Sequence, residues 1–168
     1  MTELVFAAVR GVDRQCRLRD SRSVADSVDR LAALWTRVPT TDMRDEAAFR
    51  EVYTDPVTLN GRDVAICELV ERYRALHASF TDLDIEVLDR SELPGTLAVV
   101  LRQRGRHVGP LSTALGTVEP TGRVFDVIGI DVLTVRDERI SRIWVVADDL
   151  GRLVQLEAVT LAAPAGDT

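Results

Sequence analysis

The sequence contains no lysine, because all 21 of its basic residues are arginine. This absence excludes Schiff-base chemistry on a lysine, a phosphate-binding loop that uses a lysine, and a lysine general base. Carboxylates and the two histidines are therefore the side chains left to act as bases at neutral pH.

An excess of positive charge is also missing, since the chain carries a formal net charge of −6. Binding to nucleic acid phosphates needs a positive face, so we expect no nucleic acid partner. The apolar run near the start, from Leu4 to Val9, is too short for a signal peptide and far too short for a membrane span. We therefore expect a cytoplasmic protein that does not bind a membrane.

Cysteine and histidine are scarce. The two cysteines, Cys16 and Cys67, form no disulfide framework, and we expect both to be buried thiols in a reducing compartment. Neither histidine has a ligand partner at the spacing of a zinc or iron site, so we expect no metal. The glycine-rich motifs of dinucleotide and phosphate binding and the nucleophile elbow are also absent, and we expect no cofactor.

Helical periodicity in the first half of the chain gives way to a period of two after residue 83. Residues 1–22 show no clear period and form an arm of uncertain order, residues 23–159 form one domain, and residues 160–168 are predicted to be a disordered tail. The pattern predicts helices at 23–38, 42–52 and 63 to 77 or 80, a short strand at 53–59, strands at 83–91, 96–107, 124–135 and 140–148, and a last short helix from residue 150.

Helices followed by an antiparallel meander indicate an α+β fold. We expect the N-terminal helices to pack on one face of a strongly curved, mainly antiparallel sheet. Such a sheet, covered by a long helix, forms a cone with an open mouth, and a cone of this kind is a natural pocket for a small molecule.

The strand at 140–148 presents candidate site residues on one face, because Arg142, Trp144, Val146 and Asp148 alternate with the other side. An acid at the end of an apolar strand face suits a general base, because desolvation raises its pKa. The alternative is that Asp148 and Asp149 cap the following helix. If this face lines the cavity, Arg142 lies inside it and needs a partner.

Other candidates lie on neighbouring elements. His107 ends a long strand on the face of its apolar residues, and the alternative is a surface histidine near a turn. Asp131 lies in an apolar strand, where it is either inward and paired or on a wet face. Trp35, Tyr53 and Phe80 are candidate wall residues of the pocket, although aromatic residues at helical spacing more often belong to a core.

The C-terminal half contains several segments typical of one known family: Gly105-Arg106-His107-Val108-Gly109, Pro120-Thr121-Gly122-Arg123, Gly129-Ile130-Asp131, Ile140 to Trp144, Val146 to Gly151 and Gln155-Leu156. In these segments the chain resembles the SnoaL-like polyketide cyclases, which belong to the nuclear transport factor 2-like superfamily of cystatin-like α+β barrels.

The resemblance implies a cofactor-independent ester cyclase of antibiotic biosynthesis. Family cyclases close the last ring of an aromatic polyketide ester by an intramolecular aldol condensation. By this resemblance Asp148 is the catalytic acid/base, His107 polarises the electrophilic oxygen, and Trp144 lies in the pocket. Arg142 stands where many members carry glutamate; it favours an anionic substrate or an ion pair with Asp131 or Asp148, and near Asp148 it would lower the pKa of that acid.

The substrate implied is a small, apolar, polyketide-like carbonyl compound, and the resemblance also implies a homodimer formed through the open sheet face. Two other functions fit the same fold. One is epoxide hydrolysis, with Asp131 and Asp148 flanking an arginine and activating water. The other is a non-catalytic module that binds a small molecule or forms dimers.

Overall fold

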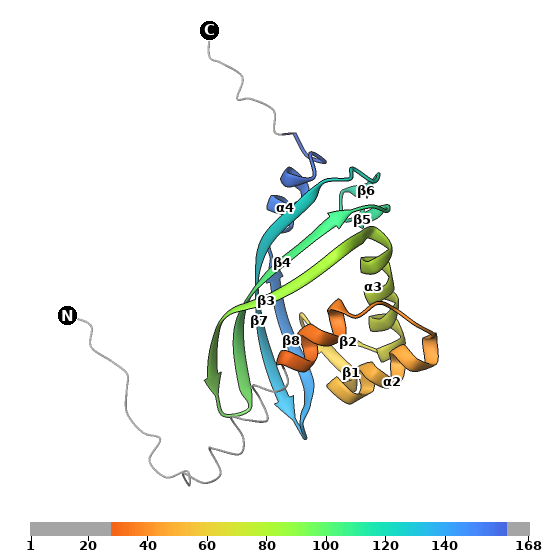
Figure 1. The fold of residues 1–168 in the computed structure, drawn as a ribbon. Helices are drawn as coiled ribbons and strands as arrows, with labels where there is room; N and C mark the ends of the chain where they lie inside the picture. The colour runs from red at the N-terminus through yellow and green to blue at the C-terminus, as the bar shows by residue number, and fades with distance from the viewer. Residues whose placement is uncertain (1–27, 161–168) are drawn as a thin grey trace, which may run out of the picture.

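The computed structural model describes residues 28–160, in which helices pack against one side of a long, curved sheet (Figure 1). After a helical segment at 28–36, the elements are α2 (Asp42–Val52), β1 (Tyr53–Leu59), β2 (Arg62–Val64), α3 (Ile66–Ser79), β3 (Phe80–Leu93), β4 (Thr96–His107), β5 (Leu111–Thr113), β6 (Gly116–Val118), β7 (Val124–Arg136), β8 (Arg139–Ala147) and α4 (Asp149–Gln155).

The main sheet has the strand order β2-β1-β8-β7-β4-β3. Its neighbouring strands run antiparallel except β1 and β8, which are parallel. The predicted α+β fold with a mainly antiparallel, curved sheet is thereby confirmed. The sheet is not closed, since β2 and β3 form its two edges, and the short hairpin of β5 and β6 stands apart from it.

Strand β7 fixes the two faces of the sheet, because it pairs with β4 on one side and with β8 on the other. Its side chains alternate between buried and exposed along most of its length. Phe125, Val127 and Leu133 are buried on the concave side, whereas Ile128 and Ile130 are exposed on the outer side. This alternation decides which polar groups of β7 reach the interior.

An aromatic cluster anchors the helices to the concave side of the sheet. The Phe49 ring of α2 packs against Tyr53 of β1 and Tyr73 of α3, with ring centroids 5.8 and 5.2 Å apart. Trp35 packs edge-on against Phe49 at 5.6 Å. Rings in this arrangement interact favourably beyond the area that they bury, so the cluster holds Trp35 and Tyr53 in fixed positions.

The segment between β1 and α3 differs from the sequence prediction. Asn60 and Gly61 both adopt positive φ, at 47° and 82°, and this tight turn sends the chain back along β1 as the short strand β2. Asp63 therefore lies in a strand and accepts a hydrogen bond from Thr58, and the helix that we expected from residue 63 begins at Ile66. The backbone N–H of Ile66 at the start of α3 bonds to Asp55 instead, at 3.2 Å.

Smaller differences concern the segments around the long strands. The hairpin of β5 and β6 occupies what we expected to be a loop, and β3 begins at Phe80 instead of residue 83. Cys67 is exposed, so the expectation that it is buried is wrong. The predicted arm at 1–22, Cys16 and residues 161–168 of the predicted tail lie outside the described residues. Within residues 28–160, no helix is long and apolar enough to cross a membrane.

A buried carboxylate, Asp45 of α2, ties three segments together. Its oxygens accept hydrogen bonds from the backbone N–H and the hydroxyl of Thr40, at 3.1 and 2.8 Å. They also pair with Arg74 of α3 at 2.8 Å and with Arg37 at 3.2 Å. Asp45 is fully buried although both arginines are partly exposed, so this network joins α2 and α3 to the segment that follows the first helix.

We predict that Asp45→Ala lowers the free energy of unfolding by about 2 kcal/mol or more, because hydrogen bonds to a charged group contribute roughly 1.5–3 kcal/mol each. Urea unfolding followed by circular dichroism measures the change. Glu46→Gln on the same helix is the matched control and should change stability little, since Glu46 forms only an i,i+4 ion pair with a half-exposed Arg50. Equal stabilities for the two variants would contradict this role of Asp45.

Candidate functional site

A cavity of about 250 Å³ lies between the concave side of the sheet and helix α3. Most of its lining is aliphatic or aromatic, and strands β1, β3, β4, β7 and β8 contribute to it together with α3 and α4. Its polar lining groups are Trp35, Tyr53, Arg72, Asp84, Gln103, Asp131 and Arg152. An apolar cavity with a few polar groups is the usual form of a small-molecule site.

Asp131 of β7 is the buried acid of this cavity. The alternation of β7 turns its side chain inward, and only 9% of the residue is exposed. Its neighbours across the sheet, Val99 and Val145, are apolar. Burial alone raises the pKa of Asp131 from its ordinary 3.8 to about 6, because no described cation faces its carboxylate and stabilises the charged form.

Tyr53 and Trp35 line the same cavity as this acid. The indole N–H of Trp35 donates a hydrogen bond of 2.6 Å to the Tyr53 hydroxyl oxygen, which leaves the hydroxyl hydrogen free for another acceptor. Burial raises the pKa of Tyr53 far above its usual value, and the charge of Asp131 raises it further. Tyr53 therefore remains a neutral phenol that can donate a hydrogen bond into the cavity.

The other end of the cavity carries a second polar group. Arg152 of α4 lies with its guanidinium carbon 5.0 Å from the centre of the Phe125 ring, and it donates a hydrogen bond of 3.1 Å to Gln103 of β4. Its side chain is only 15% exposed. Burial lowers the pKa of Arg152, although the group remains charged at neutral pH.

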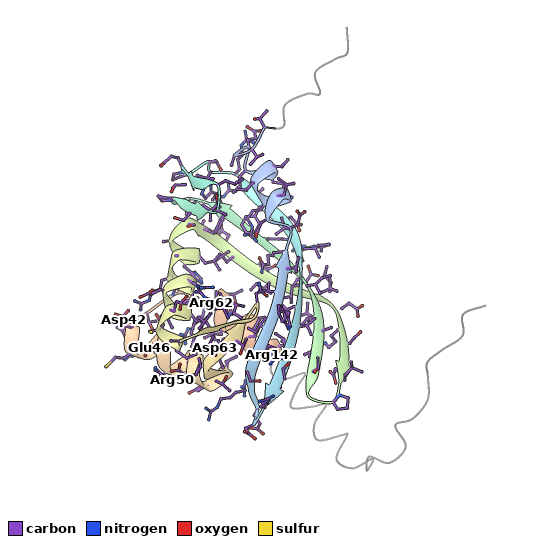
Figure 2. The ribbon with its side chains drawn as sticks, turned by 180° about the vertical axis from the view of Figure 1, so that it is seen from behind. Asp42, Glu46, Arg50, Arg62, Asp63 and Arg142 are labelled. Carbon is purple, nitrogen blue, oxygen red and sulfur yellow. The ribbon has the colours of Figure 1, made fainter. Side chains whose placement is uncertain are left out.

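The expectation that the Trp144 face of β8 lines the cavity is wrong. Trp144 and Val146 are 51% and 74% exposed, and Arg142 is exposed beside them. Figure 2 shows Arg142 on β8 near Asp63 of β2, in the part of the sheet where Arg142 pairs with β1. The inward residues of β8 are Ile143 and Val145. Both faces of this strand are apolar, so its sequence alternation does not distinguish inside from outside.

Asp148 does not line the cavity. It is exposed and caps α4, where its carboxylate accepts the backbone N–H of Gly151 at 2.8 Å. A Cβ at position 151 would lie 2.1 Å from the Asp148 carboxylate, so any other residue there would displace the capping carboxylate from its present position. The Asp148–Gly151 spacing thus has a structural explanation, which is the helix-capping alternative raised from the sequence.

His107 is fully buried, but it lies next to a second core cluster rather than in the cavity lining. The backbone N–H of Thr121 donates to its Nδ1 at 3.3 Å, so the ring proton is assigned to Nε2. The Phe80 ring packs against it at 5.4 Å and also lies outside the lining. The histidine therefore holds the loop before β7 in place. The nearby Gly109 packs closely against α3, since a Cβ at this position would lie 2.0 Å from a carbonyl oxygen of that helix.

Of the residues predicted for the site, the structure brings Trp35, Tyr53 and Asp131 together and leaves Asp148, His107, Trp144, Arg142 and Phe80 outside the cavity. Arg152 and Gln103 also line the cavity, although we did not expect them there from the sequence. Gln103 is a polar position on the strand face of Leu97, Val99 and Leu101, and Arg152 lies one helical turn before the buried Leu156. Among residues 28–160, no group of His, Cys, Asp or Glu is arranged to hold a metal ion.

Comparison with known families gives a match over most of the chain. The model of the SnoaL-like polyketide cyclase family matches residues 25–156. The chain belongs to the SnoaL-like polyketide cyclase family. Among curated proteins, none matches the chain significantly.

Solved structures share this fold. TsrD from Streptomyces laurentii is 21% identical, covers 89% of this chain and all of its own, and superposes with a TM-score of 0.68. A protein from Jannaschia sp. CCS1 described as SnoaL-like is 22% identical with the same coverage and a TM-score of 0.69. A SnoaL-like polyketide cyclase from Agrobacterium tumefaciens is 17% identical, with 81% and 96% of the chains covered and a TM-score of 0.61. At these identities the likeness establishes the fold.

The buried Asp131 predicts a pH-dependent effect on stability. Its pKa in the folded protein, about 6, exceeds the ordinary 3.8, so the folded state holds the proton more tightly. Wild-type stability therefore falls as the pH rises from about 4 through 6. Relative to the wild type, the free energy of unfolding of Asp131→Asn should rise by about 2–3 kcal/mol between pH 4 and pH 8, because each unit of pKa shift corresponds to about 1.4 kcal/mol and the acid of the unfolded chain is already partly ionised at pH 4.

Urea unfolding at the two pH values measures this gain. Asp126→Asn is the control, since Asp126 lies on the same strand but is exposed and paired with Arg104 at 3.2 Å. The control should not reproduce the gain. A stability difference between Asp131→Asn and the wild type that is independent of pH would show that Asp131 is not a desolvated acid.

Proposed function

We propose that this protein is a cofactor-independent polyketide cyclase that closes a ring by an aldol-type reaction, with Asp131 as the base. The observation that carries the proposal is a desolvated carboxylate in an apolar cavity whose lining also includes a neutral phenol. The predicted cytoplasmic location and role in antibiotic biosynthesis rest on the sequence and the family, and they remain predictions.

The reaction begins with proton transfer. The Asp131 carboxylate removes a proton from a carbon next to a substrate carbonyl, and the electron pair of that C–H bond forms an enolate. The enolate carbon then attacks a ketone or aldehyde carbon of the same molecule, so that one C–C bond forms and the carbonyl π bond becomes an alkoxide. The proton held by Asp131 returns to this alkoxide and restores the carboxylate.

Tyr53 is the proposed hydrogen-bond donor to the developing negative charge. Its hydroxyl accepts from Trp35 and therefore directs its own hydrogen elsewhere. A donor held in place inside an apolar cavity stabilises an enolate oxygen more strongly than water does, because it needs no reorganisation during the reaction. The raised pKa of Tyr53 keeps it protonated throughout.

The apolar lining supports a substrate with fused rings and few polar groups. The volume of about 250 Å³ lies just below the roughly 300–1,000 Å³ of typical ligand sites, which favours a compact ring system. Epoxide hydrolysis by two aspartates around an arginine is not favoured, because Asp148 is exposed and caps α4. A module that binds a ligand without catalysis is the outcome that the next experiment distinguishes.

We predict that the protein, in D2O, catalyses exchange of the α-hydrogens of 2-tetralone. This bicyclic ketone reports on proton removal without ring closure. Asp131→Asn should abolish the catalysed exchange, since a general base contributes about 10²–10⁴-fold to such a step. The rate should rise with pH through about 6, because the base acts in its deprotonated form. Proton NMR follows the loss of the α-hydrogen signals.

Asp148→Asn is the matched control, and it should retain exchange, because an asparagine side chain can still cap a helix. Loss of exchange in Asp148→Asn with retention in Asp131→Asn would show that Asp148 is the base and Asp131 is not. Absence of catalysed exchange in the wild type would favour the non-catalytic module. Ring closure itself is then tested with aromatic polyketides, both as free acids and as esters, by mass spectrometry of the products.

We also propose that two copies pair through the outer face of the sheet, as the family resemblance implies. Ile128, Ile130, Trp144 and Val146 are exposed there, and Ile130 pairs directly with Val146 across β7 and β8. Ion pairs between arginines and acids flank this patch, for example Arg102 with Glu86 at 3.2 Å. A surface with both signs of charge around an apolar centre can pair with a second copy of itself about a two-fold axis.

We predict that the wild type has the mass of a dimer in light scattering after size-exclusion chromatography. Ile130→Glu should shift it to the monomer, because it places a charge in the centre of the apolar patch. Leu115→Glu is the control, since Leu115 is exposed on the turn between β5 and β6 and away from this face. A monomeric wild type, or a dimeric Ile130→Glu variant, would contradict the proposed interface.

A further inference from the structure

The end of the cavity next to α4 has hydrogen-bond donors that the proposed reaction does not use. Arg152 reaches into the lining from α4, and its Nη2 donates to the side-chain oxygen of Gln103. This bond fixes the orientation of the Gln103 amide. Its oxygen is occupied, so its NH2 group is the part left to contact a ligand.

The Arg152 guanidinium is also incompletely paired. Its Nη1 lies 3.0 Å from Asp149, whose side chain is largely exposed, so solvent weakens that pair. Its Nε is buried out of reach of a ligand in the cavity and has no hydrogen-bond partner among residues 28–160. Each Nη carries two hydrogens and has one printed partner, so the Nη atoms are the donors that a ligand could contact.

We propose that Arg152 and Gln103 bind a carboxylate of the substrate, so that the protein acts on a free carboxylic acid and not on its ester. Both residues offer donors at this end of the cavity, and a carboxylate is the acceptor that an arginine and an amide NH2 group bind best. The inference rests on the proposed function only in placing the ligand in the same cavity.

The spacing of the two ends sets the length of the ligand. Asp131 lies opposite Val99 of β4, and Gln103 follows Val99 by four residues on the same inward face. At about 3.3 Å per residue, Val99 and Gln103 are roughly 13 Å apart along β4. A fused-ring acid would therefore place its carboxylate against Arg152 and a carbonyl-flanked carbon near Asp131, which fixes the orientation of the ring system.

The two acids whose charges act on Arg152 at this end, Asp149 and Asp148, are both exposed, so solvent weakens their effect on a bound anion. Arg72 and Asp84 line the cavity nearby, and both side chains are exposed and paired with neighbours, Glu68 and Arg104 respectively. Arg152 is thus the least exposed cation of the lining. The Phe125 ring beneath it holds the guanidinium plane in place.

The experiment compares 2-naphthoate with methyl 2-naphthoate by isothermal titration calorimetry at pH 7.5. The wild type should bind the acid about tenfold more tightly or better, the size expected of charge-assisted hydrogen bonds. The Trp35 indole N–H signal, distinguished from that of Trp144 by the Trp144→Phe variant, should shift in NMR spectra on binding. No preference for the acid, or no shift of the Trp35 signal, would overturn the proposal.

Three variants separate this role from general effects. Arg152→Gln should bind the acid and the ester equally, and Gln103→Glu should prefer the ester, because the new carboxylate pairs with Arg152 and repels the ligand. Arg72→Gln, at an exposed cation of the same lining, should keep the preference of the wild type. Retention of the acid preference in both Arg152→Gln and Gln103→Glu would refute the proposal, and Gln103→Glu decides if Arg152→Gln does not fold.

Asp131→Asn distinguishes this proposal from the proposed function. That variant should lose exchange of 2-tetralone hydrogens and keep the preference for naphthoate. If the wild type prefers the acid but does not catalyse exchange, the carboxylate site is supported and the cyclase mechanism is contradicted. Catalysed exchange without acid preference would contradict only the carboxylate site.

Discussion

The structure depends on the pairing of β7 with β4 on one side and β8 on the other. This pairing fixes the alternation of β7, so that Asp131 must point into the interior wherever Val127 and Leu133 do. A slip by one residue would bury Ile130 instead and move the acid to the outer face. The position of the proposed base therefore follows from the register that builds the sheet.

An unpaired acid in an apolar cavity reduces stability at neutral pH, because its charged form is desolvated. The buried network around Asp45 and the aromatic cluster around Phe49 supply rigidity on the same side of the molecule. Proteins commonly retain a residue that lowers stability where a functional site needs that residue. A chain without lysine must use other side chains as bases, and the cavity provides a carboxylate together with a phenol and an arginine.

The sequence predicted the fold well and the site only in part. Long strands such as 96–107 alternate clearly, and the order of helices and strands sufficed for the α+β fold. The faces of β8 could not be told apart, because Trp144 and Val146 are as apolar as Ile143 and Val145. The motif around Asp148 resembled a catalytic one, but its glycine is explained by a helix cap. Arg152 and Gln103 meet only through the packing of α4 against the sheet.

The proposed mechanism requires that one aspartate of the cavity holds its proton to a pH near neutrality and acts as a base once it has released that proton. Carbon-13 NMR of protein labelled at the aspartate carboxyl carbons measures this titration. We expect one carboxyl signal that titrates near pH 6, absent in Asp131→Asn and present in Asp148→Asn. The mechanism would be contradicted if every aspartate titrated near its ordinary pKa, or if the signal near pH 6 persisted without Asp131.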